Sequence, residues 1–363
     1  MKTWIACAML SLFASVAGAA EPKLLTTGDA GVSAVTLSPD GAWAVFAQRR
    51  GAQMGSDVCV ANLASGEIRN LTARLPKPPD SDQFPQPQVT PDGKSVLYND
   101  HQDLWSVPLA GGEPVQVTRD EQVTGFLVHP KWNVVLFTSR RSFDTRELKG
   151  KGPKGAVAYL IGKLFKIDLA KNNEVSRFTN DVVSDTDTMA LTPDGLVVSI
   201  SEYPDSDGRF SDRKVTLLDA KGKRKALHAA VFGFPPAFLG NGTTLLMLDQ
   251  VMGKDNRFTY PVLQLRAKDG KKLAPLPVTL PEGHDVTNLW TAPDGKSVIL
   301  GEGSPKTGVR LWRWQEGQKE MTRLCEKELR SLEGGAVTPD GKKLVFMAGE
   351  DGMAYGQLGV LDL

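Results

Sequence analysis

The sequence is poor in the residues that most often carry catalysis or bind metals. Its 363 residues include three Cys and four His, and 43 Lys and Arg balance 42 Asp and Glu to a net charge of +1. General nucleic-acid binders usually carry a basic excess, so we expect no nucleic-acid partner. The 36 Gly and 23 Pro are scattered along the chain, which excludes collagen and favours a chain rich in turns.

The few cysteines do not form a recognisable framework. Cys7 lies in the first apolar segment, which leaves Cys59 and Cys325 in distant parts of the chain. Two distant Cys are neither a zinc site nor a disulfide framework. A disulfide needs Cα atoms within about 7 Å, so we expect two free, mostly buried thiols.

Residues 1–20 have the pattern of a secretory signal peptide. Lys2 supplies the charged start, Trp4 to Val16 the apolar run, and Ala17-Gly18-Ala19 the small-residue cleavage site. Cleavage after Ala19 or after Ala20 fits equally well. The apolar run is shorter than the ~20 residues that span a membrane, and no later segment is longer. We therefore expect a periplasmic or secreted protein without a membrane span, with one domain over 21–363.

One short pattern recurs through the rest of the chain. The stretch from Leu37 to Phe46 reads Leu-Ser-Pro-Asp-Gly-Ala-Trp-Ala-Val-Phe, and Val89 to Tyr98 repeats it as Val-Thr-Pro-Asp-Gly-Lys-Ser-Val-Leu-Tyr. Pro-Asp-Gly turns also begin at Pro193, Pro293 and Pro339, and degenerate copies lie at Pro130 and Gly240. The copies follow one another at intervals of 39 to 63 residues, the spacing of a repeat architecture.

Each repeat predicts four β-strands. An inner strand leads to the turn, in which Pro presets φ, Asp bonds the backbone and Gly accepts a positive φ. A β-rich second strand, a third strand and a fourth strand ending near Leu-Thr or Val-Thr follow. The sequence therefore predicts an all-β fold, a seven-bladed β-propeller of four-stranded blades.

The two ends of the chain complement each other. The last repeat stops after its third strand, Gln357–Leu363, whereas Lys23–Thr27 has the pattern of a fourth strand. Pairing these segments would close the last blade and leave fewer free strand edges. We expect the N-terminal strand to complete the ring in this way.

The Ser/Thr-Pro-Asp-Gly turns, the apolar second strand and the Leu-Thr ending together resemble the TolB-like β-propeller repeat. The resemblance covers nearly all of residues 21–363, and it is specific for fold rather than for function. It implies a periplasmic propeller that binds other proteins. TolB itself also has an N-terminal α/β domain, which we do not expect in this chain because its predicted first blade begins within a few residues of the signal.

Two enzyme families have similar repeats. Prolyl-oligopeptidase-type peptidases add a hydrolase domain, but this chain has no Gly-x-Ser-x-Gly motif. Oligogalacturonate lyases bind a metal through clustered His and a Gln, whereas His101, His129, His228 and His284 each fall in a different repeat. We assign no catalytic residue and no metal ligand. Polysaccharide lyase or hydrolase chemistry at the channel mouth remains the alternative function.

Loop lengths indicate which face of the propeller binds. The loops between second and third strands are long, and long loops on a rigid scaffold often carry function. The largest is basic and is a candidate for binding a protein or an anionic polymer, although a solvated loop without a partner is the simpler explanation of a run of charges. Its basic residues are Arg140, Arg141, Arg146, Lys149, Lys151 and Lys154.

Acidic residues near the starts of the inner strands form a second group of candidates. Asp82 and Asp187 lie there, as do Asp80, Asp185 and the pair His284 and Asp285. Carboxylates from several blades would suit Ca²⁺ in the central channel, whereas isolated Asp residues ordinarily cap turns. His284 beside Asp285 has the composition of a general base held by a carboxylate, but sequence neighbours on a strand point apart.

These patterns together predict a binding scaffold rather than an enzyme. We expect a monomer that engages an envelope protein or an anionic polymer through its long-loop face, without a cofactor other than the channel Ca²⁺ considered above.

Overall fold

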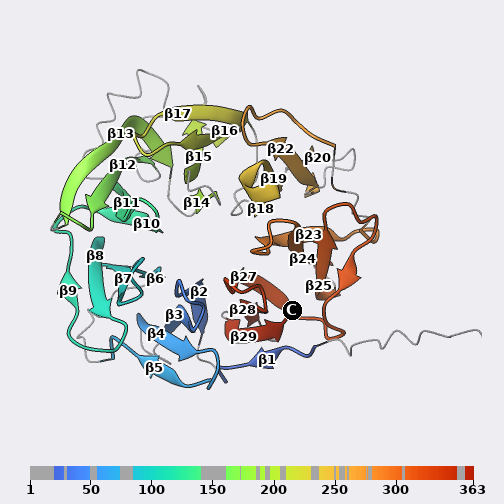
Figure 1. The fold of residues 1–363 in the computed structure, drawn as a ribbon, viewed down its shortest axis with the longest axis horizontal. Coiled ribbons are helices and arrows are strands. Elements are labelled where there is room, and N and C mark those ends of the chain that lie inside the picture. Colours follow the sequence, from blue (N-terminus) through green and yellow to red (C-terminus); the bar gives the residue numbers. More distant parts are fainter. Residues whose placement is uncertain are drawn as a thin grey trace, which may run out of the picture.

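The computed structural model shows an all-β protein with a propeller-like arrangement of antiparallel sheets around a common centre (Figure 1). It describes residues 20–27, 31–49, 55–73, 85–139, 161–171, 173–184, 189–192, 197–204, 210–229, 237–248, 251–252, 258–259, 261–274, 276, 280–304, 307–349 and 356–363. In these ranges, none of the helices has the length and apolarity needed to cross a membrane.

Four sheets have four strands each, paired in chain order as the repeat predicts. The first has β6 (Gln88–Val89), β7 (Ser95–Asp100), β8 (Asp103–Pro108) and β9 (Val115–Gln116). The second has β10 (Val123–His129), β11 (Val134–Ser139), β12 (Ile161–Asp168) and β13 (Glu174–Ser184). The third has β14 (Ala190–Leu191), β15 (Val197–Pro204), β16 (Phe210–Leu218) and β17 (Arg224–Ala229), and the fourth β23 (Asp285–Thr291), β24 (Ser297–Ser304), β25 (Thr307–Gln315) and β26 (Thr322–Arg323).

One repeat has a shorter sheet. It holds β18 (Ala237–Leu239), β19 (Thr244–Leu248) and β22 (Val262–Arg266), with the 3-10 turn η4 (Gly240–Gly242) between the first two. In the described part of the next segment, Lys272 forms a single bridge with Leu265. A separate ribbon of β20 (Val251–Met252) and β21 (Phe258–Thr259) lies between β19 and β22 in sequence.

The first and last repeats share one eight-stranded sheet. Its strands are β1 (Lys23–Leu24), β2 (Val32–Leu37), β3 (Trp43–Arg49), β4 (Ser56–Asn62), β5 (Ile68–Asn70), β27 (Ser331–Val337), β28 (Lys343–Gly349) and β29 (Gly356–Asp362). β29 pairs with β1, where Leu24 faces Gly359, and touches β2 at one position, where Val32 faces Gly356. The two ends of the described chain therefore lie side by side (Figure 1).

The Pro-Asp-Gly turns have the expected chemistry. In the turn after β2, Asp40 accepts hydrogen bonds from the Ser38 hydroxyl at 2.5 Å and from the Ala42 N–H at 3.0 Å, and Gly41 has φ of 71°. These bonds lower the pKa of the Asp40 carboxyl, because they stabilise its charged form. The same arrangement recurs at Asp92 and Asp340, whereas the turn predicted at Pro193 lies outside the described residues.

Turns of neighbouring repeats touch one another. A Cβ atom built on Gly41 would lie 2.8 Å from Pro339 Cδ, and one on Gly341 would lie 3.6 Å from Pro293 Cδ. The N–H of Gly240 donates to the carbonyl of Gly295 at 2.7 Å. Four consecutive repeats are thus joined at one end of the assembly through their first turns.

Apolar residues fill the spaces between sheets. Val45, Val58 and Val60 of the first repeat pack with Val96 and Tyr98 of the next. The alternation along each strand sends successive side chains to opposite sheet faces, and here both faces are covered. The strands are consequently apolar on both sides, for example in β28, where the five central residues are buried.

The expectation for the two cysteines is confirmed. Cys59 and Cys325 are buried thiols that form no disulfide, and burial raises the pKa of the Cys325 thiol. His129 is a turn residue in the core: its Nδ1 accepts the Trp132 N–H at 3.1 Å, and the two rings stack 3.8 Å apart.

The contact between turns generates a matched test. Gly41 and Gly93 both have φ of 71°, but only the Cβ added at Gly41 would meet Pro339, whereas nothing lies within 4 Å of one at Gly93. Both G41A and G93A should lower the free energy of unfolding by about 1 kcal/mol, because alanine is disfavoured in the left-handed backbone conformation. We expect G41A to lower the free energy of unfolding by at least about 1 kcal/mol more than G93A does, because its added methyl group also overpacks against Pro339. Urea unfolding of the two variants measures this difference, and equal midpoints would contradict the turn contact.

A second test addresses the pairing of β1 with β29. The Thr26 hydroxyl accepts the buried Leu358 N–H at 2.9 Å, next to the bond from Leu25 N–H to Leu358 O at 2.8 Å. T26A should lower the free energy of unfolding by about 1–3 kcal/mol, because it leaves that donor without an acceptor. T26S keeps the hydroxyl and serves as the control. Thermal unfolding curves that coincide for T26A and the unchanged protein would refute the role of this strand.

Candidate functional site

The structure places only two of the residues predicted for a site. Asp82, Asp187 and the basic loop residues Arg140, Arg141, Arg146, Lys149, Lys151 and Lys154 lie outside the described residues, and so do Asp80 and Asp185. His284 and Asp285 are described. They lie where the connection from the preceding repeat enters β23.

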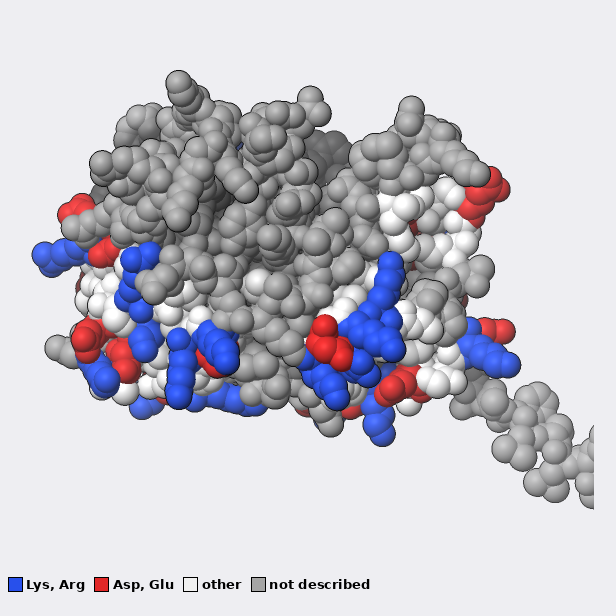
Figure 2. All heavy atoms as spheres, turned by 90° about the horizontal axis from the view of Figure 1, so that it is seen from above, with Lys and Arg blue, Asp and Glu red and all other residues white. Residues whose placement is uncertain are grey.

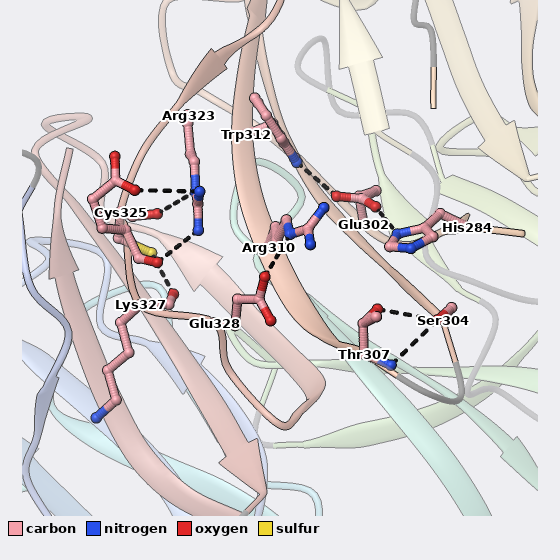
Figure 3. A network of polar contacts seen from close by, with 11 residues as sticks. His284, Glu302, Ser304, Thr307, Arg310, Trp312, Arg323, Cys325, Lys327 and Glu328 are labelled. Atoms are coloured by element: carbon pink, nitrogen blue, oxygen red, sulfur yellow. Dashed lines mark hydrogen bonds and ion pairs between the residues drawn. The ribbon is translucent and has the colours of Figure 1, made fainter. Parts of the chain in front are cut away.

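His284 meets a buried carboxylate, which belongs to Glu302. The imidazole Nδ1 is hydrogen-bonded to Glu302 Oε1 (Figure 3). The side chains are 11% and 1% exposed, so the pair is nearly removed from solvent. Buried charges require partners, and each of these groups is the other's partner.

The second oxygen of Glu302 is also occupied. Glu302 Oε2 accepts the indole N–H of Trp312 at 2.9 Å (Figure 3). Glu302 lies near the end of β24, and Trp312 lies in the adjacent strand β25. The carboxylate is therefore fixed from two sides, by a ring from the incoming connection and by a ring from the neighbouring strand.

The carboxylate bonded to His284 is not that of its sequence neighbour Asp285. Asp285 begins β23 and pairs with Gly303 in the sheet register, and the carboxylate bound to His284 Nδ1 is that of Glu302. Adjacent residues of an extended chain point in different directions. Glu302, 18 residues further along the chain, is brought to His284 by the antiparallel pairing of β23 with β24.

A pocket opens beside the pair. It has a volume of about 410 Å³, and its lining residues are Leu280, Pro281, Glu302, Trp312, Lys319, Glu320 and Met321. Leu280, Trp312 and Met321 pack against the apolar cluster between the sheet of β18, β19 and β22 and the sheet of β23 to β26. The pocket is thus supported by the packing of two neighbouring sheets.

Around this pocket the sheet departs from the polar pattern of the first two repeats. There, the hydroxyl of Thr72 bonds Asp57 and accepts the Val58 N–H, and Thr118 does the same with Asp103 and Leu104. These bonds explain the Leu-Thr and Val-Thr endings of the sequence repeat. Each hydroxyl ties the end of the fourth strand to the start of the third.

In the sheet of β23 to β26 the equivalent positions are Arg310 and Cys325. The strand register sets this equivalence, because Trp312 faces Arg323 just as Trp105 faces Gln116. Arg310 therefore takes the place of Asp103, two residues before the Trp, and Cys325 takes the place of Thr118, two residues after its partner. Arg310 bonds Glu328 at 2.7 Å, which lowers the pKa of the Glu328 carboxyl. Arg323 bonds the Cys325 carbonyl at 2.9 Å, and Cys325 Sγ donates to the Lys327 carbonyl (Figure 3).

Glu302 and Trp312 were missed as site residues by the sequence analysis. Trp312 and Trp314 are alternate residues of one strand, which places them on the same sheet face, and both pack against one apolar cluster. Glu302 carried a signal that was available: it is the one charged residue in the buried strand Ser297–Ser304. A lone carboxylate in such a strand needs a partner.

No group of three or more His, Cys, Asp or Glu among the described residues is arranged to hold a metal ion. The Asp residues considered for channel Ca²⁺ lie outside those residues, so the structure does not test that expectation. His284 and Glu302 could supply two ligands at most, fewer than the 6–8 oxygens that Ca²⁺ takes.

Solved structures with similar folds include two lyases and a protease domain. An oligogalacturonate lyase in complex with manganese has a TM-score of 0.64 and 14% identity, covering 96% of this chain and 94% of that chain. An oligogalacturonate lyase from Vibrio parahaemolyticus has a TM-score of 0.61 and 14% identity, over 94% and 93% of the chains. The β-propeller domain of the Trilobed protease from Pyrococcus furiosus has a TM-score of 0.60 and 12% identity, over 92% and 96%.

These likenesses define the class of the fold, a β-propeller. No family model matches the chain, and no curated protein matches it. At these identities a shared fold carries no activity with it. The TolB-like repeat therefore stays a sequence prediction.

The buried pair predicts a large effect on stability. E302A should lower the free energy of unfolding by about 3 kcal/mol, because it removes one partner of a buried pair and leaves the Trp312 N–H without an acceptor. E328A is the matched control in the same sheet: its ion pair with Arg310 has a Glu side chain that is 40% exposed, so the loss should stay below about 1 kcal/mol. Denaturant titrations compare the two variants. A loss for E302A no larger than that for E328A would contradict the pairing.

Proposed function

We propose that the protein is an exported, seven-bladed TolB-like β-propeller that binds a protein or an anionic envelope polymer. Export follows from the signal-peptide pattern of residues 1–20, and seven blades follow from the seven sequence repeats. The N-terminal strand β1, paired with β29, would close the last blade. Four complete four-stranded sheets, and a fifth with three strands, support this architecture.

The pocket beside Glu302 is the observation that carries the binding function. It is preformed, its walls are mostly apolar, and a fixed carboxylate lies on its lining. Ligand pockets combine apolar walls with a few placed polar groups and occur at about this size. A rigid propeller that displays such a pocket beside the sheet of β23 to β26 suits recognition of a partner.

The basic loop is the second part of the proposed binding surface. Residues 140–154 carry six Lys and Arg against Asp144 and Glu147. A positive loop attracts acidic proteins and polyanions over several ångströms and speeds their association. The loop belongs to the long-loop face that the sequence assigns to partner binding.

The loop can be tested in cells. Cross-linking of the exported protein, followed by mass spectrometry, should capture an envelope component, and shortening residues 140–154 should abolish that capture. A second variant keeps the loop length and replaces its six Lys and Arg with Gln, which separates charge from length. Capture that persists in both variants would exclude the loop as a binding element.

Catalysis at His284 is the second candidate function. The hydrogen bond to Glu302 fixes the orientation of the imidazole, as a general base requires. The lyase or hydrolase alternative would place a uronate oligomer beside this ring. Turnover of uronate oligomers by the purified protein, lost in H284A, together with a stoichiometric bound metal, would establish this alternative and displace the scaffold function.

A further inference from the structure

We infer that the pocket beside Glu302 receives a lysine or arginine side chain of a protein partner. This inference rests on the binding function proposed above, and it names the partner's chemistry and the residues that recognise it.

The walls of the pocket suit an aliphatic stem. Leu280 and Pro281 arrive from the connection that precedes β23, Met321 comes from the segment before β26, and Trp312 comes from β25. Leu280, Met321 and Trp312 are partly buried against the cluster behind them, so the walls are backed by packed side chains. The methylene groups of Lys and Arg bury themselves along such apolar surfaces.

The carboxylate of Glu302 suits a cationic head. A carboxylate offers about four acceptor positions, and His284 and Trp312 take one each. Arg310 faces Glu302 across the strand pair, and its charge acts on Glu302 as well as on Glu328, which its Nε bonds at 2.7 Å. A cation entering the pocket would meet the edge of Glu302 that lines it, from a side chain that is 1% exposed, and would lie beside the Trp312 ring, which attracts cations as well.

Other occupants match the lining less well. An anion such as a uronate would meet the like charge of Glu302. A neutral sugar needs several polar partners, whereas the described lining residues offer, besides Glu302, Lys319 and Glu320, which are both exposed. At about 410 Å³ the pocket lies near the small end of the range for ligand sites, which fits one side chain rather than an oligomer.

The direct test uses small probes that isolate the side chain. The full protein is titrated with n-butylammonium and n-butylguanidinium, and with n-butanol and butyrate as matched neutral and anionic probes, while the indole N–H signal of Trp312 is followed by NMR. W312F assigns the signal. We expect both cations to shift it saturably, and at least tenfold more tightly than butanol or butyrate.

Two variants separate charge from shape. E302Q should weaken butylammonium binding by at least tenfold, and E328Q, which changes an acid outside the pocket lining, should leave it unchanged. M321A shortens one apolar wall of the pocket on its partly exposed side, so it should weaken the binding of butylammonium more than the binding of methylammonium. This variant keeps the test decisive if E302Q fails to fold. Butanol binding as tightly as butylammonium, tighter binding of butyrate or a uronate, or no shift with any cation would each overturn the inference.

The partner experiment distinguishes this inference from the function on which it rests. A captured protein partner should leave with E302Q and M321A, and a peptide from it containing Lys or Arg should shift the Trp312 signal. A partner that both variants retain would refute the pocket assignment while the binding function stands. Cations that bind without any captured partner in cells would count against the binding function instead.

Discussion

The contact of each repeat with its neighbour is the constraint on which this structure depends. A four-stranded antiparallel sheet with two apolar faces is not stable on its own in water, and it becomes stable when adjacent sheets cover both faces. The clusters between sheets and the touching turns at Gly41 and Pro339 meet that requirement. Packing against the neighbouring repeat therefore fixes the side chains at these contacts.

The pocket beside Glu302 shows how a site arises within such a repeat. The first two repeats hold their third and fourth strands together with an Asp and a Thr hydroxyl. At the equivalent positions, the sheet of β23 to β26 has Arg310 and Cys325, and its charged groups bond to Glu328 and to backbone carbonyls instead. This local change in the repeat pattern lies next to the buried Glu–His pair and the pocket beside it.

The sequence predicted those features that depend on short-range chemistry. The Pro-Asp-Gly turns, the strands beside them and the buried thiols follow from residues a few positions apart, and the structure confirms them. The partner of His284 depends instead on strand register. A bulge between Val286 and Asn288 shifts the pairing of β23 with β24, so counting alternate residues cannot identify Glu302.

Strand β1 has a consequence for how the protein is made. The hydrogen bond between Thr26 and Leu358 spans 332 residues. Thr26, which carries the acceptor, is therefore synthesised long before the donor Leu358. Contacts of such high sequence separation slow folding, because loop-closure entropy is lost before they form. A nascent chain would carry β1 as an unpaired strand throughout translation. Cells that overproduce this protein should therefore depend on chaperones that shield exposed strand edges.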